Sequence, residues 1–439
     1  MMMRVTMMGR GGRGDMGGIA GHVVRCSKHR EYRSRIPGCR YDIVKMDART
    51  PQNDFRQSLA WTSDEPMGLV IDRAEGPYLV LEDGSRVIDL ISGIAVSSIG
   101  HRHPAVLDAI RAQLDRHLHV MVYGEFVQRE QAGFAADLAA ALPPGLDSVY
   151  FTMTGTEANE GALKLAKKAT GRTRMVAFTN SYHGDTHGSL SVTGRNVYRD
   201  PFLPLLPEVT FLPFGDVDAL GAIDESVACV ITEPIQGEGG IIVPSDAWHR
   251  ALRDRCTATG AVLIFDEIQT GFGRTGSLFA FKRFGVVPDV VTFAKAMAGG
   301  MPLGAFVSSR ERMAAFRSDP PLSHVTTFGG HPVSCAAARA TLRVLIDEAL
   351  PQRARWIESM VRERLEHPSI VEIRGRGAML GMQLTDADLT ARMVGRCREN
   401  GVLLGWTLHS NSLVRIAPPL NIDKSVLREA LDVIVQALD

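Results

Sequence analysis

The sequence lacks several features that would assign it to particular compartments or partners. Its 439 residues include only six cysteines, none paired as CxxC or spaced as metal ligands, so we predict free thiols and no metal site. No apolar run approaches the roughly 20 residues of a membrane helix. Lys plus Arg equals Asp plus Glu, 49 each, so no overall field attracts nucleic acid or a membrane. These absences predict a cytoplasmic protein that acts on small polar molecules.

The composition is that of a globular chain, apart from its start. With 45% hydrophobic and 22% charged residues, the chain can form a large core and two domains. Residues 1–45 differ, because they are rich in Arg and Gly and poor in acids. We expect this segment to be a disordered extension or a mis-assigned start. An organellar transit peptide is less favoured, because amphipathic periodicity is weak.

Two polar residues follow short apolar runs. Asp266 comes after residues 261–265, and Lys295 comes after residues 290–293. Both runs resemble buried parallel strands, and ligands of open α/β sheets bind where such strands end. A lysine desolvated there has a lowered pKa, so its neutral amine can form a Schiff base with a carbonyl. A neighbouring acid could keep the ring nitrogen of pyridoxal phosphate protonated.

A Thr-Gly-Thr segment, residues 154–156, lies between an expected strand at 149–152 and an expected helix at 157–169. Free N–H groups and the helix dipole could bind an anion there, and Gly155 would allow close approach. A capping box from Thr154 to Glu157 explains the same residues without any ligand. The segment by itself favours capping alone.

Two longer motifs include the strand ends. Residues 266–276 read Asp-Glu-Ile-Gln-Thr-Gly-Phe-Gly-Arg-Thr-Gly, and residues 295–304 read Lys-Ala-Met-Ala-Gly-Gly-Met-Pro-Leu-Gly. They resemble the class III aminotransferases, and the resemblance extends from about Met67 to the C-terminus. It implies pyridoxal 5'-phosphate and an α/β type I fold, with a mostly parallel seven-stranded sheet and a smaller α+β domain. We expect an N-terminal segment at 46–104 that joins the small domain, a large domain at 105–345 and the small domain at 346–439.

The resemblance also implies residue roles. Lys295 would hold the cofactor and carry a proton, while Asp266 would face the ring nitrogen. The other implied cofactor contacts are Thr154, Gly155, Thr156, Tyr182, His183, Glu233, Gln269 and Thr327. Tyr182 would stack on the ring and Gln269 would bond its phenolic oxygen, whereas for His183 we favour a structural role. Thr327 would reach the phosphate of a neighbouring subunit, which implies a homodimer with shared sites.

Four residues bear on substrate choice. By resemblance, Glu238 would pair with Arg415 when an ω-amine is bound and release it to bind an α-carboxylate, as arginine suits that group. Asp185 stands where acetylornithine and 4-aminobutyrate enzymes usually carry Arg, whereas Ile94 agrees with that branch. The Tyr-His-Gly-Asp-Thr order instead resembles diaminopelargonate aminotransferase. We therefore expect a donor with a neutral or cationic distal end.

These features predict transfer of an amino group from an amino acid or ω-amine to a 2-oxo acid. The expected acceptor is 2-oxoglutarate, and the expected kinetics are ping-pong through aldimine and ketimine steps. Three alternatives remain open: a diaminopelargonate-type enzyme, a racemase or aminomutase of the same fold, and a relative without catalysis. Neither nucleic acid nor membrane is expected as a partner.

Overall fold

The computed structural model describes residues 50–122, 124–406 and 410–439. The chain divides into two compact units, with the boundary between Val70 and Ile71. In the first unit, the described part holds helix α1 (Pro51–Ser58), and the Phe55 ring stacks on Trp61 at 5.8 Å. The expectation for residues 1–45 concerns a segment outside the described residues.

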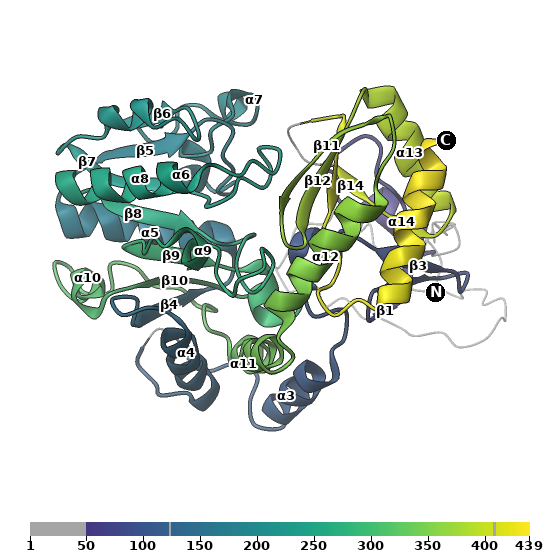
Figure 1. Cartoon of the computed structure of the whole chain (residues 1–439). Coiled ribbons are helices and arrows are strands. Elements are labelled where there is room, and N and C mark those ends of the chain that lie inside the picture. Colours follow the sequence, from purple (N-terminus) through teal and green to yellow (C-terminus); the bar gives the residue numbers. More distant parts are fainter. Residues whose placement is uncertain (1–49, 123, 407–409) are drawn as a thin grey trace, which may run out of the picture. The chain divides into compact units, whose positions relative to one another are not determined.

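A seven-stranded sheet is the centre of the second unit (Figure 1). Its strand order is β4 (Ser148–Thr152), β10 (Gly304–Ser308), β9 (Val290–Phe293), β8 (Val262–Asp266), β7 (Val227–Thr232), β5 (Arg174–Phe178) and β6 (Val209–Leu212). Only β10 runs antiparallel to its neighbours, and the other pairs are parallel. The predicted mostly parallel seven-stranded sheet is confirmed.

Helices cover both faces of this sheet, which is why its strands read as continuous apolar runs. Helix α5 (Gly155–Thr170) belongs to one core cluster with Cys229 and Ile231 of β7. Helix α8 (Asp246–Thr259) belongs to another cluster with Val230 of the same strand. Because successive strand residues point to opposite faces, the two helices lie on opposite sides of the sheet (Figure 1).

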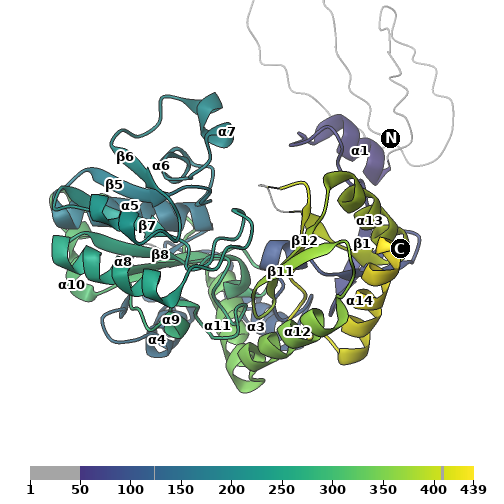
Figure 2. The same ribbon diagram turned by 45° about the horizontal axis from the view of Figure 1, so that its top comes forward.

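Two smaller sheets complete the unit. One has the order β1 (Ile71–Glu75), β2 (Tyr78–Leu81), β3 (Arg86–Asp89) and β13 (Val402–Leu403), and β13 runs parallel to β3. The turn pair Asp83-Gly84 lies in the hairpin that joins β2 to β3, and Gly84 has a positive φ of 84°. The other sheet has the order β11 (Ile370–Arg376), β12 (Met379–Leu384), β15 (Leu413–Ile416) and β14 (Gly405–Trp406). Helices α12 (Leu350–Arg364), α13 (Ala387–Glu399) and α14 (Lys424–Leu438) lie beside it (Figure 2).

Three further long helices precede or follow the large sheet in sequence: α3 (Pro104–Leu114), α4 (Arg129–Ala141) and α11 (Pro332–Asp347). Helix α3 ends at Leu114, and Gln113 Nε2 donates to His117 O in the turn that follows. The short helices are α2 (Ser92–Ala95), α6 (His187–Ser191), α7 (Asn196–Arg199), α9 (Phe281–Phe284) and α10 (Arg310–Met313). Four 3-10 turns are η1 (Asp200–Phe202), η2 (Asp218–Ala222), η3 (Lys295–Ala298) and η4 (Ala314–Phe316). Of the helices in the described ranges, none combines the length and apolar character needed to cross a bilayer.

Candidate active site

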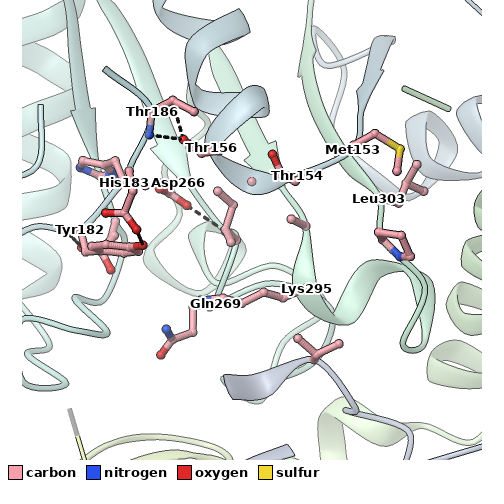
Figure 3. A pocket seen from close by; sticks show the side chains of 18 of the residues that line it. Met153, Thr154, Thr156, Tyr182, His183, Thr186, Asp266, Gln269, Lys295 and Leu303 are labelled. Atoms are coloured by element: carbon pink, nitrogen blue, oxygen red, sulfur yellow. Dashed lines mark hydrogen bonds and ion pairs between the residues drawn. The ribbon is translucent and has the colours of Figure 1, made fainter. Parts of the chain in front are cut away.

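A pocket of about 650 Å³ opens at the carboxyl ends of the parallel strands (Figure 3). Its walls come from the segments that follow β4, β5, β7, β8 and β9, which is where ligands bind in such sheets. Six of the lining residues are predicted site residues with ionisable or phenolic side chains: Tyr182, His183, Asp185, Glu233, Asp266 and Lys295. Thr154, Gly155, Thr156 and Gln269 line the same pocket.

Lys295 begins turn η3 directly beyond strand β9. Its backbone has a φ of +47°, an unfavourable value for a residue with a side chain. Backbone strain of this kind persists only where the surrounding structure enforces it. Burial lowers the pKa of the Lys295 amine, although the nearby Glu238 carboxylate opposes this. The lysine is therefore placed to act as a neutral amine.

Asp266 is a buried carboxylate whose orientation is held from two sides. Its Oδ2 accepts hydrogen bonds from His183 Nδ1 and Asn159 Nδ2, both at 2.8 Å. Its Oδ1 accepts from Ile268 N at 3.0 Å. A carboxylate constrained in this way can hold a protonated ring nitrogen in one orientation. His183 contacts this carboxylate and also lines the pocket.

The Thr-Gly-Thr segment forms both a cap and a potential anion site. Thr154 Oγ1 accepts from Glu157 N at 3.3 Å, and Glu157 Oε2 accepts from Thr154 N at 3.1 Å, so the expected capping box is present. No acceptor among the described residues takes the N–H of Gly155 or Thr156. These two donors at the start of α5 can bind an anion while the cap stays intact.

Tyr182 and Asp185 are bonded to each other on the loop that follows β5. Tyr182 Oη donates to Asp185 Oδ2 at 2.9 Å, and the Tyr182 backbone N–H donates to Glu233 Oε2 at 3.2 Å. Glu233 Oε1 also accepts from Gly237 N at 2.9 Å. Burial raises the pKa of Glu233 to about 7 and also raises the pKa of Tyr182.

Glu238 and Arg415 form a buried ion pair beside Gln269. Arg415 Nη2 donates to Glu238 Oε2 at 2.5 Å, and Gln269 Nε2 donates to Glu238 Oε1 at 3.1 Å. Burial alone would raise the pKa of Glu238, but the charge of Arg415 holds it below its usual value. The pairing expected from the sequence is therefore present, although neither partner lines the pocket itself.

Two observations differ from the predictions made from the sequence. Ile94 is exposed and does not line the pocket, where Val96 is found instead. Thr327 is exposed and lies outside this chain's pocket, and its contact with a neighbouring subunit stays a prediction. Asn159, which contacts Asp266, was not among the predicted site residues. It lies on the buried face of α5 with Ala162 and Ala166, and a polar residue on an apolar helix face was the signal that could have identified it.

The chain is similar to known proteins over most of its length. Residues 60–438 match the family described as aminotransferase class-III. The acetylornithine aminotransferase of Methanosarcina mazei is 42% identical over 376 residues, which cover 84% of this chain and 91% of that protein. The enzyme of the same name from Streptomyces coelicolor is 41% identical over 377 residues, with 84% and 91% covered. Among solved structures, the ornithine aminotransferase from Toxoplasma gondii has a TM-score of 0.82 at 31% identity, with 88% and 94% covered.

Proposed function

The chain belongs to the class III aminotransferases, and on that premise we propose that it transfers the amino group of an ω-amine donor to 2-oxoglutarate. It is a transaminase that depends on pyridoxal phosphate. When bound, this cofactor supplies a ring that accepts the electrons released as a donor C–H bond breaks. The observation that carries the two-substrate proposal is the buried Glu238–Arg415 pair beside the pocket.

The residues of the pocket fit this cofactor. The unpaired N–H groups of Gly155 and Thr156 suit its phosphate, and the fixed Asp266 carboxylate suits its ring nitrogen. Within the described chain, Gln269 Oε1 is buried without a hydrogen-bond partner. Figure 3 shows Asp266, Gln269 and Lys295 around the same space. We propose that Tyr182 stacks on the ring and that Lys295 holds the cofactor covalently between turnovers.

Lys295 also moves the proton in this proposal. Because burial lowers its pKa, its Nζ can take a proton from the donor carbon that carries the amine and later return it. Asp266 stays in place throughout, because His183, Asn159 and the Ile268 N–H hold both of its oxygens. The roles of the two residues are thus separate, one moving a proton and the other holding charge.

Arg415 would receive the α-carboxylate of 2-oxoglutarate after Glu238 turns away. A bidentate bond to a carboxylate suits the guanidinium, and the acceptor replaces the negative charge that Glu238 withdraws. While the two side chains are paired, their charges neutralise each other. An uncharged part of the donor can then lie beside them without facing an unpaired buried charge.

The names of the relatives make acetylornithine the first donor to test. Asp185 favours a second candidate, a diamine or basic amino acid. Its carboxylate lines the pocket, bonded to Tyr182 Oη, where it would repel a distal carboxylate and attract an ammonium group. Of the described residues that line the pocket, Lys295 is the only Lys or Arg.

We further propose a homodimer. Two segments carry exposed large apolar side chains, which we together call the apolar face: Leu114, Leu118, Val120, Phe126 and Val127 in one, and Leu322, Val325 and Phe328 in the other. Its two segments adjoin, since the His119 and Phe328 rings lie 5.0 Å apart. Thr327 lies within this face and outside the pocket of its own chain, so a second copy bound here could receive it.

The function is tested by measuring glutamate formed from 2-oxoglutarate with acetylornithine, ornithine, lysine, 4-aminobutyrate, diamines and S-adenosylmethionine. We expect at least one donor to be active, and Lys295→Ala to lower turnover about 10³-fold because proton transfer is lost. The exposed Lys424→Ala is the matched control. If the folded, cofactor-loaded protein yields no glutamate with any donor, the proposal is wrong.

A further inference from the structure

Asn159 connects strand β9, which precedes Lys295, to the carboxylate of Asp266. Its Nδ2 donates to Asp266 Oδ2 at 2.8 Å and to the His183 carbonyl at 2.7 Å. Its Oδ1 accepts from Thr292 Oγ1 at 2.7 Å. Thr292 lies on β9, just before Lys295, and both Asn159 and Thr292 are fully buried.

The chemistry of the neighbours determines the orientation of the Asn159 amide. A carboxylate oxygen and a carbonyl oxygen only accept hydrogen bonds, so the NH₂ group must face Asp266 and His183. The amide oxygen must then face β9, where it needs a donor. Thr292 supplies that donor, because its hydroxyl can rotate to present its hydrogen. Without this hydroxyl, the buried amide oxygen would lose the donor that β9 provides, and the amide would be held less firmly.

The geometry points to Asn159, oriented by Thr292, as a positioning residue for Asp266. This inference rests on the proposed role of Asp266 beside the ring nitrogen. Together with His183, Asn159 occupies Oδ2, while the Ile268 N–H contacts Oδ1. The carboxylate is thereby held with its remaining lone pairs available to the pocket. Strand β9, which leads into Lys295, thus also helps to orient the acid.

A merely structural role for Thr292 makes a different prediction. Loss of a buried hydroxyl would then lower the stability of the cofactor-free protein and leave cofactor binding unchanged. A positioning role instead changes how the loaded site holds a protonated ring nitrogen. Cofactor affinity and the pH response of its visible absorption band distinguish the two.

The experiment compares Thr292→Val, which removes the hydroxyl at nearly constant shape, with Thr292→Ser, which keeps it. For Thr292→Val we expect the dissociation constant of pyridoxal phosphate, measured by equilibrium dialysis, to rise about tenfold. We also expect the band to change at a lower pH, because a poorly held Asp266 favours the protonated ring less. Thr292→Ser should stay within about twofold of the wild type. Thr390→Val removes another buried threonine hydroxyl, in α13, and controls for packing.

Asn159→Ser is the second variant, and it keeps the inference testable if Thr292→Val does not fold. We expect Asn159→Ser to show the same changes in cofactor affinity and band pH that we expect of Thr292→Val. The melting temperature of the cofactor-free protein reports folding for each variant. One result would overturn the inference and leave the role of Asp266 intact. In that result, Thr292→Val and Asn159→Ser bind pyridoxal phosphate as the wild type does and their band changes at the wild-type pH, while Asp266→Ala binds the cofactor more weakly. If Asp266→Ala itself changes neither the affinity nor the band, the proposed role of Asp266 fails and the inference fails with it.

Discussion

At the scale of single residues, Asp185 has the largest expected effect on donor choice. It is exposed on the pocket wall and accepts a hydrogen bond from Tyr182 Oη. The relatives carry names that specify acetylornithine, a donor with a distal carboxylate, and an acid at this position cannot bind that group. Sequence similarity and local electrostatics therefore favour different donors.

Replacing Asp185 with arginine should change this preference. We expect Asp185→Arg to raise kcat/KM for acetylornithine relative to a diamine by about tenfold, because a charged hydrogen bond replaces a repulsion. Asp185→Asn keeps a hydrogen-bonding group beside Tyr182 but removes the charge. It should lower the preference for cationic donors without adding a group that binds the carboxylate of acetylornithine. Steady-state rates over the donor series measure both effects. An unchanged ratio in Asp185→Arg would place the donor's distal end elsewhere.

At the scale of elements, Glu267 fixes the turn that follows β8. Its oxygens accept from Thr270 Oγ1 at 2.7 Å, from Ala280 N at 3.0 Å and from Phe281 N at 2.7 Å. These bonds connect the end of the strand to the start of α9. The side chain is fully buried, and burial raises its pKa to about 7 from 4.5.

This buried acid makes stability depend on pH. Between pH 4.5 and about 7 the folded protein holds a proton on Glu267 that the unfolded chain has lost. The contribution of this group to the free energy of unfolding is therefore complete at low pH and falls by roughly 3 kcal/mol across that window. The glutamine of Glu267→Gln cannot titrate. As the pH rises from 5 to 8, the melting temperature of the wild type minus that of this variant should therefore decrease. A constant difference at all pH values would mean that Glu267 stays ionised.

Arg274 connects separate elements from within the same turn. Its fully buried guanidinium donates to Ala378 O at 3.2 Å, to Pro418 O at 2.6 Å and to Ser98 Oγ at 2.6 Å. Pro418 follows the strand that carries Arg415. The family motif thus contains a cation that joins the turn after β8 to the segment that follows Arg415.

At the scale of the whole molecule, we propose that two copies of the chain pair through the apolar face and share their active sites. We also retain the proposed division into residues 46–104, 105–345 and 346–439. The parallel pairing of β13 with β3 supports joining the N-terminal strands to the C-terminal domain.

A double substitution tests the dimer. Val127→Glu with Val325→Glu places charges within the apolar face, and each lone charge buried in an interface costs roughly 2 kcal/mol or more. We expect sedimentation velocity to show a monomer that also loses pyridoxal phosphate more readily. Val371→Glu, an exposed valine on β11, is the control and should leave the wild-type dimer intact. A wild-type protein that is monomeric and fully active would contradict the proposal.

Local patterns in the amino-acid sequence were enough to predict the family, the cofactor and the fold class. Apolar runs followed by Asp266 and Lys295 indicated strand ends, and the observed strands β8 and β9 lie there. The hairpin at Asp83-Gly84 and the cap at Thr154 were equally local, since each depends on neighbouring residues.

Only the tertiary structure decided which distant side chains meet. Asn159 lies between Asp266 and Thr292, far from both along the chain, and its amide orientation depends on all of its neighbours at once. Arg274 likewise finds its acceptors in three separate segments. Periodicity shows which face of an element is buried, but it does not show which polar partner is placed against that face. That choice depends on packing across the whole fold, because a buried polar group must find its partners wherever the folded chain brings them.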